Sequence, residues 1–205
     1  IKVGQSVNLE IDVLKRNNSK ANHSATHLLH ETLRRILGKH VTQKGSLVSP
    51  DRLRFDFSHN KPIADEEMSK INKVVNDIIK GSSEVQTRIM TPNEAVKMGA
   101  LALFGEKYGE EVRVVFMGKE NNKFFSTELC GGTHVKNTKE VGKFKIISQS
   151  SIASGVRRVE ALRDKQLEKY ENSLKQNKSL KDKNLNEEIK NIKKELQFFN
   201  IKPDY

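Results

Sequence analysis

The chain has 205 residues, a formal net charge of +11, 35% hydrophobic residues and a single cysteine. Its length allows one full domain with a smaller appendage, and it contains neither an apolar run long enough to span a membrane nor a secretory leader. The basic excess favours an anionic partner, most often nucleic acid, and one cysteine cannot form an internal disulfide, which fits a reducing cytoplasm.

The N-terminal part of the chain predicts strands followed by a helix. Residues 1–14 alternate apolar and polar side chains, which is strand periodicity. A polar turn, KRNNSK, follows, and apolar residues at three- and four-residue spacing then predict a helix from about Ala21 to Leu37, with Gly38 as its stop. Residues 52–57, RLRFDF, alternate again and predict a strand.

The middle of the chain mixes helices and strands. An amphipathic helix is predicted over residues 65–80 with Asp65 as its cap, and Thr91-Pro-Asn-Glu94 reads as a capping box that begins a short helix. Strand-like runs follow at 112–117, 123–129, 141–148 and 155–162. Because there is no strict βαβ alternation, the pattern favours an α+β fold with a largely antiparallel sheet and packed helices.

The last 42 residues, from Asp164, contain no glycine and are dense in Lys, Glu and Asn. Their ten lysines and eight acidic residues give a net charge of +2, which leaves +9 of the total +11 on residues 1–163. Apolar residues at three/four spacing, with one break in register, predict a long helix or a helical hairpin. A marginal coil without its natural partner is the alternative.

Two histidines lie four residues apart in the first predicted helix. That spacing places His23 and His27 on one helical face, about one turn apart, where both imidazoles can bind one metal ion. Cys130 and His134 form a second pair, and the glycines between them let the backbone bend sharply.

The two pairs together make a four-ligand set of nitrogen and sulfur. Zn(II) accepts such mixed ligands in tetrahedral geometry, and a saturated site of this kind is usually structural, whereas a catalytic one keeps a position open for water. A buried structural cysteine with unrelated histidines is the alternative. His30, one turn beyond His27, could support a ligand or replace one, although packing or solvent exposure is the simpler interpretation.

Both pairs lie within longer blocks that resemble a known family. In chain order the blocks are NHSATHLLH, VTQKGSLV, RLRFDFSH, ALFGEKYGEEVRVV, ELCGGTHV and GVRRVEA. They resemble the editing domain of alanyl-tRNA synthetase, a module also found in stand-alone alanyl-tRNA editing proteins and, in related form, in threonyl-tRNA synthetase. The resemblance covers roughly residues 1–163.

The resemblance implies a zinc-dependent hydrolase that cleaves the ester between serine or glycine and tRNA(Ala). It implies that His23, His27, Cys130 and His134 are the zinc ligands, and that Cys130 is not a nucleophile. The metal would orient the substrate or polarise water. The acceptor end of tRNA(Ala) and the remainder of the synthetase chain would be its partners.

Further residues are candidates for substrate contact. Thr42 or Gln43, and after them Ser46, are placed to recognise the serine hydroxyl, unless they are ordinary polar residues at the start of a strand. Arg157 and Arg158, with Arg52 and Arg54, are candidates for phosphate contacts, although only some can face the RNA from alternating strands.

The resemblance divides the chain into three parts. Residues 1–14 are expected to end a preceding small β-barrel, 15–163 to form the editing domain, and 164–205 to begin a helical linker. The start at Ile1 favours a central portion of a synthetase over a stand-alone editing protein. Two hypotheses of other classes remain, which are a zinc-stabilised RNA-binding module without catalysis and a protein that self-associates through its helical tail.

Overall fold

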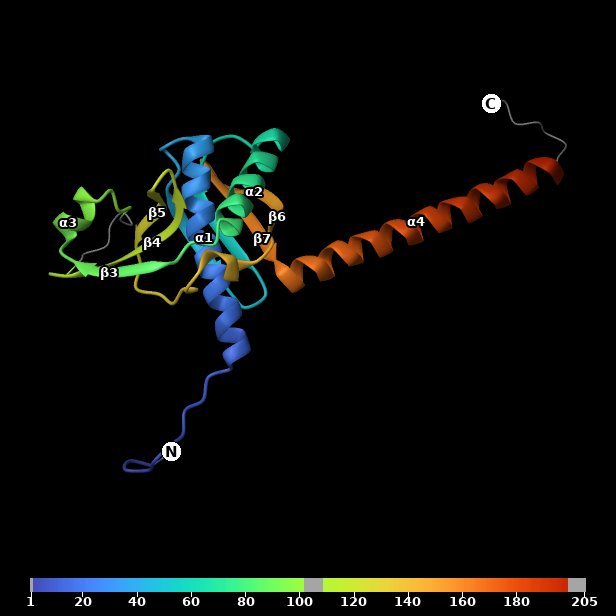
Figure 1. The fold of residues 1–205 in the computed structure, drawn as a ribbon. Helices are drawn as coiled ribbons and strands as arrows, with labels where there is room; N and C mark the ends of the chain where they lie inside the picture. The colour runs from blue at the N-terminus through green and yellow to red at the C-terminus, as the bar shows by residue number, and fades with distance from the viewer. Residues whose placement is uncertain (1, 102–108, 199–205) are drawn as a thin grey trace. The chain divides into compact units, whose positions relative to one another are not determined.

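A computed structural model of the chain describes residues 2–101 and 109–198 (Figure 1). It divides into two compact units, Ile1–Gln166 and Leu167–Tyr205. Among the described residues, no helix combines the length and the apolar character needed to cross a membrane. The block ALFGEKYG lies mostly within 102–108 and therefore mostly outside the described residues.

The first unit holds two antiparallel sheets and the helices packed between and around them. The four-stranded sheet has the order β1-β2-β7-β6 and the three-stranded sheet the order β3-β4-β5. The elements are α1 (Val13–Leu37), β1 (Gln43–Val48), β2 (Leu53–Ser58), α2 (Asp65–Lys80), β3 (Gln86–Met90), α3 (Pro92–Lys97), β4 (Val112–Glu120), β5 (Lys123–Leu129), η1 (Thr138–Val141), β6 (Phe144–Ala153) and β7 (Val156–Arg163). The predicted α+β class with antiparallel sheets is confirmed.

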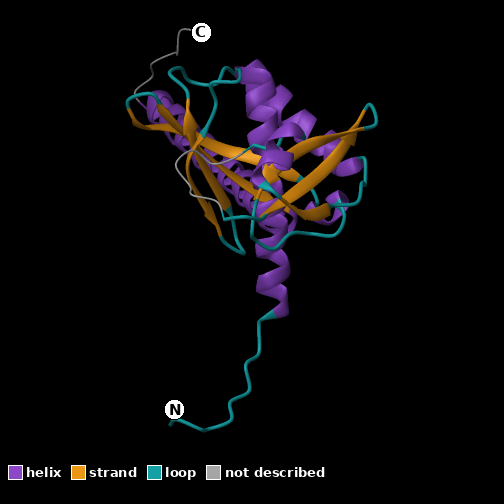
Figure 2. Ribbon diagram, turned by 90° about the vertical axis from the view of Figure 1, so that its left-hand side faces the viewer, coloured by secondary structure: helices purple, strands orange, loops and turns teal. Residues whose placement is uncertain are grey.

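The hydrophobic core lies between α1, α2 and the four-stranded sheet. Leu28 and Leu33 of α1 and Phe55 of β2 are fully buried in one cluster, and burial of each such side chain contributes roughly 1.5–3 kcal/mol. In Figure 2 the strands lie on either side of α1, which runs up from the N-terminal loop. The helix that carries the first histidine pair is thus held from both sides.

The face of the four-stranded sheet that points away from the hydrophobic core, its outer face, carries charged pairs. Asp56 of β2 stands across from Arg158 of β7 and is 5% exposed. Both carboxylate oxygens of Asp56 accept hydrogen bonds from the Arg158 guanidinium, at 2.7 and 2.8 Å, and Arg54 Nη2 lies 3.5 Å away. The buried carboxylate is therefore neutralised by a two-point contact across the strands.

The strand prediction for residues 1–14 is wrong. Residues 2–12 form neither strand nor helix and are exposed, and α1 already begins at Val13. A strand needs a partner for its backbone hydrogen bonds, and no described strand pairs with this segment. Asp12 instead caps α1 by accepting a hydrogen bond from the Lys15 amide at 2.9 Å, so that KRNNSK is helical rather than a turn.

The helix α2 has the predicted bounds but not the predicted cap. Ala64 occupies the N-cap, and its amide donates to the Glu67 carboxylate at 2.9 Å, while Asp65 is the first helical residue. The capping box of α3 is confirmed, because the Thr91 hydroxyl accepts from the Glu94 amide and the Glu94 carboxylate accepts from the Thr91 amide.

The second unit is the greater part of one continuous helix, α4 (Asp164–Phe198). The long-helix prediction is confirmed, and the hairpin alternative is wrong. Five of its apolar side chains are 41–57% exposed, namely Leu174, Leu180, Leu185, Ile189 and Ile192. Self-association through this helix remains a prediction.

Candidate metal centre and adjoining cavity

The structure brings together the two ligand pairs that the sequence separates by about a hundred positions. His23 and His27 lie on one face of α1, with ring centroids 5.0 Å apart. Cys130 directly follows β5, and His134 lies in the loop beyond it. One ligand atom from each of the four residues lies within 4.8 Å of the others, and Cys130 Sγ is 3.5 Å from His23 Nε2 and 3.4 Å from His134 Nε2.

These residues fit a four-coordinate metal ion. Bonds of about 2.0 Å to nitrogen and 2.3 Å to sulfur in a tetrahedron give a nitrogen–sulfur separation of roughly 3.5 Å, which agrees with both sulfur–nitrogen distances of 3.5 and 3.4 Å. His27 Nε2 is buried and has no hydrogen-bond partner in the described residues. Because buried polar atoms are rarely left unpaired, an ion at the centre of the cluster would supply the partner that this nitrogen lacks.

Gly132 is required for the close approach of the loop to α1. A Cβ atom built on Gly132 would lie 2.3 Å from a carbon of the His23 ring, whereas a Cβ atom on Gly131 would meet nothing within 4 Å. The backbone of Gly132 also anchors the loop, because Arg113 Nη1 donates to its carbonyl at 2.7 Å and to the Cys130 carbonyl at 2.8 Å. The glycine therefore admits the imidazole beside the thiol.

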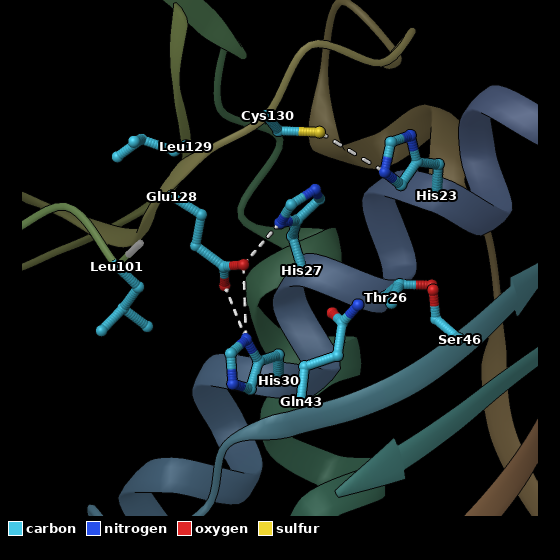
Figure 3. A pocket seen from close by; sticks show the side chains of 10 residues that line it. All are labelled: His23, Thr26, His27, His30, Gln43, Ser46, Leu101, Glu128, Leu129 and Cys130. Carbon is cyan, nitrogen blue, oxygen red and sulfur yellow. Dashed lines mark hydrogen bonds and ion pairs between the residues drawn. The ribbon is translucent and has the colours of Figure 1, made fainter. Parts of the chain in front are cut away.

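Each histidine of the cluster has a hydrogen-bond partner at Nδ1, which leaves Nε2 for the metal. His27 Nδ1 is 2.8 Å from Glu128 Oε2, His134 Nδ1 is 3.2 Å from Ser24 Oγ, and His23 Nδ1 is 3.2 Å from the Thr133 carbonyl. Figure 3 shows Glu128 between His27 and His30, with Cys130 above them. Such partners fix both the ring orientation and the tautomer of a ligand.

The protonation states favour a metal ligand at Cys130. Burial acts to raise the pKa of the Cys130 thiol, but hydrogen bonds from His134 and His23 outweigh it and lower the pKa to about 3. Burial lowers the pKa of His134 to about 4 despite its contact with Cys130. At neutral pH the thiol is thus a thiolate and His134 is neutral, which are the forms that bind a metal. Burial acts to lower the pKa of His27, but Glu128 and Cys130 outweigh it and raise the pKa to about 10, so a metal ion at His27 Nε2 would displace a proton.

Glu128 is a site residue that sequence reasoning missed. It is 6% exposed and contacts Nδ1 of both His27 and His30, so its carboxylate holds two turns of α1 against β5. Burial acts to raise its pKa, but the charge of His27 and hydrogen bonds from His27 and His30 hold the pKa well below its usual range. Strand alternation was the available signal, since residues 128 and 130 fall on the same face.

We expect Glu128→Gln to weaken metal binding by about 10- to 100-fold, because an amide has one oxygen for two histidine donors. The measurement is zinc affinity by competition with a chromophoric chelator. Glu160→Gln is the matched control, since Glu160 lies on the outer face of the sheet, 3.8 Å from Arg52. Equal affinity in both variants would contradict a role for Glu128 in positioning His27.

A cavity of about 90 Å³ adjoins the cluster. A water molecule needs roughly 10–15 Å³ of such volume, so the cavity accommodates a small group of a few heavy atoms. Its walls combine residues of α1, β1 and β5 with Leu101 (Figure 3). The lining residues are His23, Thr26, His27, His30, Gln43, Ser46, Leu101, Glu128, Leu129 and Cys130.

Of the three candidates for substrate recognition in this segment, the structure places two at the cavity. Gln43 and Ser46 both line the cavity, because an irregularity in the β1–β2 register between Gln43 and Gly45 places residues three apart on the same face. Thr42 does not line it, and its hydroxyl lies 2.9 Å from the Ser58 hydroxyl.

The arginine candidates do not share one surface. Arg54 and Arg158 flank Asp56 on the outer face of the sheet, and Arg52 lies 3.8 Å from Glu160. Arg157 stands opposite Phe57 on the helix-covered face, where its Nη2 donates to Gln149 Oε1 at 3.2 Å. Each of these arginines therefore has a polar or acidic partner within the first unit.

Comparison with known proteins matches part of this chain to a described family. The family model described as the threonyl and alanyl tRNA synthetase second additional domain matches residues 112–160, which run from β4 through the Cys130–His134 loop into β7.

Two individual relatives of the chain are alanine–tRNA ligases. The chain is 58% identical over 165 residues to an alanine–tRNA ligase of Parvibaculum lavamentivorans, and this aligned region covers 79% of the chain and 18% of the relative. It is 50% identical over 211 aligned positions to the alanine–tRNA ligase of Rickettsia felis, and that region covers 96% of the chain and 24% of the relative. The resemblance to the editing domain of alanyl-tRNA synthetase is thereby confirmed. The chain spans about a fifth to a quarter of the length of these relatives.

Proposed function

We propose that this chain is the hydrolytic editing segment of an alanyl-tRNA synthetase, which removes serine or glycine from mischarged tRNA(Ala) by cleaving the aminoacyl ester. The observation that carries the proposal is a cluster of four residues suited to hold a metal ion, beside a small cavity that is lined in part by polar side chains. The relatives named above are ligases, which favours a segment of a synthetase over a stand-alone editing protein.

An alanyl-tRNA synthetase needs a second, hydrolytic site because a pocket that binds alanine discriminates only weakly against glycine and serine. Glycine is one methyl smaller than alanine, and serine only adds a hydroxyl, so such a pocket rejects them by roughly ten- to a few-hundred-fold. A site that hydrogen-bonds the serine hydroxyl instead disfavours alanine, which would leave a buried polar group unpaired. The cavity supplies such groups in Gln43, Ser46 and Thr26.

The cluster is suited to hold Zn(II), the ion that best matches three imidazoles and one thiolate. When bound, zinc would supply electrostatic polarisation of a substrate oxygen or of water. The chain's own residues position the ester, with Gln43 directed to the amino-acid side chain and Glu128 holding His27 and His30 in place. Aminoacyl esters are labile, so positioning and modest activation of water suffice.

The proposed substrate also requires contacts to RNA. The acceptor end of tRNA(Ala) is an anionic partner that matches the charge of +9 on residues 1–163. Arg54 and Arg158 remain candidates for phosphate contacts from the outer sheet face. Arg157 lies on the opposite, helix-covered face and is a weaker candidate for that reason.

The test is a deacylation assay with seryl-tRNA(Ala), with and without bound zinc. We expect zinc-dependent release of serine, and slow or no release of alanine from the correctly charged tRNA. Binding of tRNA without any metal-dependent release of serine would overturn the editing proposal and support a zinc-stabilised RNA-binding module.

We expect Gln43→Ala to reduce serine release by roughly 10-fold or more while zinc remains bound, because loss of one hydrogen bond to a buried polar group costs about 1–3 kcal/mol. Rates and zinc content are measured on the same preparation. Thr42→Ser is the control, since it keeps the hydroxyl that contacts Ser58. Unchanged serine release by the Gln43 variant would contradict its role in recognition.

A further inference from the structure

A second and larger cavity continues from the small one along the same two elements. It measures about 530 Å³, which is within the range of roughly 300–1,000 Å³ typical of ligand sites. On α1 its wall begins at Glu31, directly after His30 of the small cavity, and on β5 it includes Thr127, directly before Glu128. Leu101 lines both cavities, so the two cavities adjoin each other along α1 and β5.

One wall of the larger cavity is basic. Arg34, Arg35 and Lys39 line it at the C-terminal end of α1. Arg34 Nη1 donates to the carbonyls of Lys39 and Val41 at 3.2 and 2.8 Å, which fixes the turn that carries Lys39. Arg35 is paired with Glu31 and Glu120, whereas Lys39 is exposed to solvent. The rigid turn thus presents an exposed ammonium group at the rim.

The other wall is apolar and includes an aromatic ring. Met98 and Leu101 line it together with Phe124, which is partly buried and packs on Phe116 with ring centroids 4.9 Å apart. Proteins that bind single-stranded nucleic acid combine a cationic track for phosphates with aromatic side chains on which bases stack. The larger cavity has both features, and it adjoins the small cavity that His23, His27 and Cys130 line.

We propose that this larger cavity binds the single-stranded nucleotides that precede the esterified adenosine of the tRNA acceptor end. The inference rests on the proposed function, because it takes the amino-acid ester to occupy the small cavity. A phosphate lies at Lys39 and a base lies against Phe124. Charge complementarity and continuity with the small cavity favour this path over the outer sheet face, where Arg54 and Arg158 are already paired with Asp56.

The experiment compares two substrates in the charge-reversal variant Lys39→Glu. Seryl-tRNA(Ala) carries the preceding nucleotides, whereas the serine ester of adenosine lacks them. Lys70→Glu is the matched control, because Lys70 is an exposed residue of α2 that lines neither cavity. Initial rates of serine release give kcat/KM for each substrate and variant, at several salt concentrations.

We expect Lys39→Glu to lower kcat/KM for seryl-tRNA(Ala) by roughly 10-fold, with a salt slope smaller by about 1, and to leave hydrolysis of the adenosine ester unchanged. Equal rates for both variants on the tRNA substrate would overturn the proposal, as would an equal loss on both substrates. If the unmodified chain hydrolysed neither substrate, the proposed function itself would fail, which is a distinguishable result.

Discussion

Replacing Cys130 with alanine is expected to abolish stoichiometric zinc binding and to lower serine release from seryl-tRNA(Ala) by at least about 100-fold. Cys130 Sγ lies 3.4–3.5 Å from two imidazole nitrogens and is the single thiolate of the cluster. Loss of a residue that binds the metal directly should have a larger effect than loss of a residue that hydrogen-bonds to a metal ligand, which lowers metal affinity or activity by roughly 10- to 100-fold. Metal content by mass spectrometry and the deacylation rate are the two measurements.

The thermal unfolding of the Cys130→Ala variant separates a functional metal from a structural one. The hydrophobic cluster around α1 and α2 contains 23 buried residues, and Cys130 is not one of them but a partly buried residue packed against the cluster. We therefore expect the variant to stay folded. Structural zinc usually contributes directly to folding, and collapse of the fold together with loss of the metal would indicate such a site. Full hydrolysis without zinc would contradict a catalytic role for the cluster.

Replacing Gly132 with alanine is expected to reduce zinc affinity by at least about 10-fold, whereas Gly131→Ala should leave it unchanged. The added methyl group at Gly132 would lie 2.3 Å from the His23 ring, and the ring must then move away from the thiol. At Gly131 the same methyl group meets nothing within 4 Å. Chelator competition on the two variants measures the difference.

The neighbouring variants control for each other, because both add one methyl group to the same loop and both change the backbone freedom of a glycine. A similar loss of affinity in both would indicate that loop flexibility matters rather than the approach to His23. Wild-type affinity in Gly132→Ala would show that His23 is not held where the structure places it.

Several elements were predictable because their determinants are local. The helix over residues 65–80 and the strand over residues 123–129 have the bounds that their periodicity predicts. The capping box at Thr91 was readable because its hydrogen bonds span three residues. In contrast, the edge strands β1 and β3 have no fully buried residue, so sequence reasoning gave β1 only as an alternative at Thr42–Ser46 and did not predict β3.

The alternating pattern of residues 1–14 gave a wrong strand prediction, because no described strand pairs with this segment. Residues 2–12 have strand periodicity, but strands depend on hydrogen bonds to a neighbour, which local sequence does not specify. Helices satisfy their backbone within the segment, and the Asp12 cap therefore begins α1 earlier than the apolar pattern indicated. This difference in hydrogen bonding explains why the end of α1 and both ends of α2 were predicted, whereas the structure of residues 2–12 was not.

By itself, the sequence determined the four candidate ligands and the family resemblance, because ligand types, spacing and motif order are properties of the chain. Only the tertiary structure decided that Glu128 contacts His27, that Gln43 rather than Thr42 lines the cavity, and that the arginines are divided between two sheet faces. The physical reason is that strand pairing and a single register irregularity set which side chains face the cavity, and neither is encoded in local periodicity.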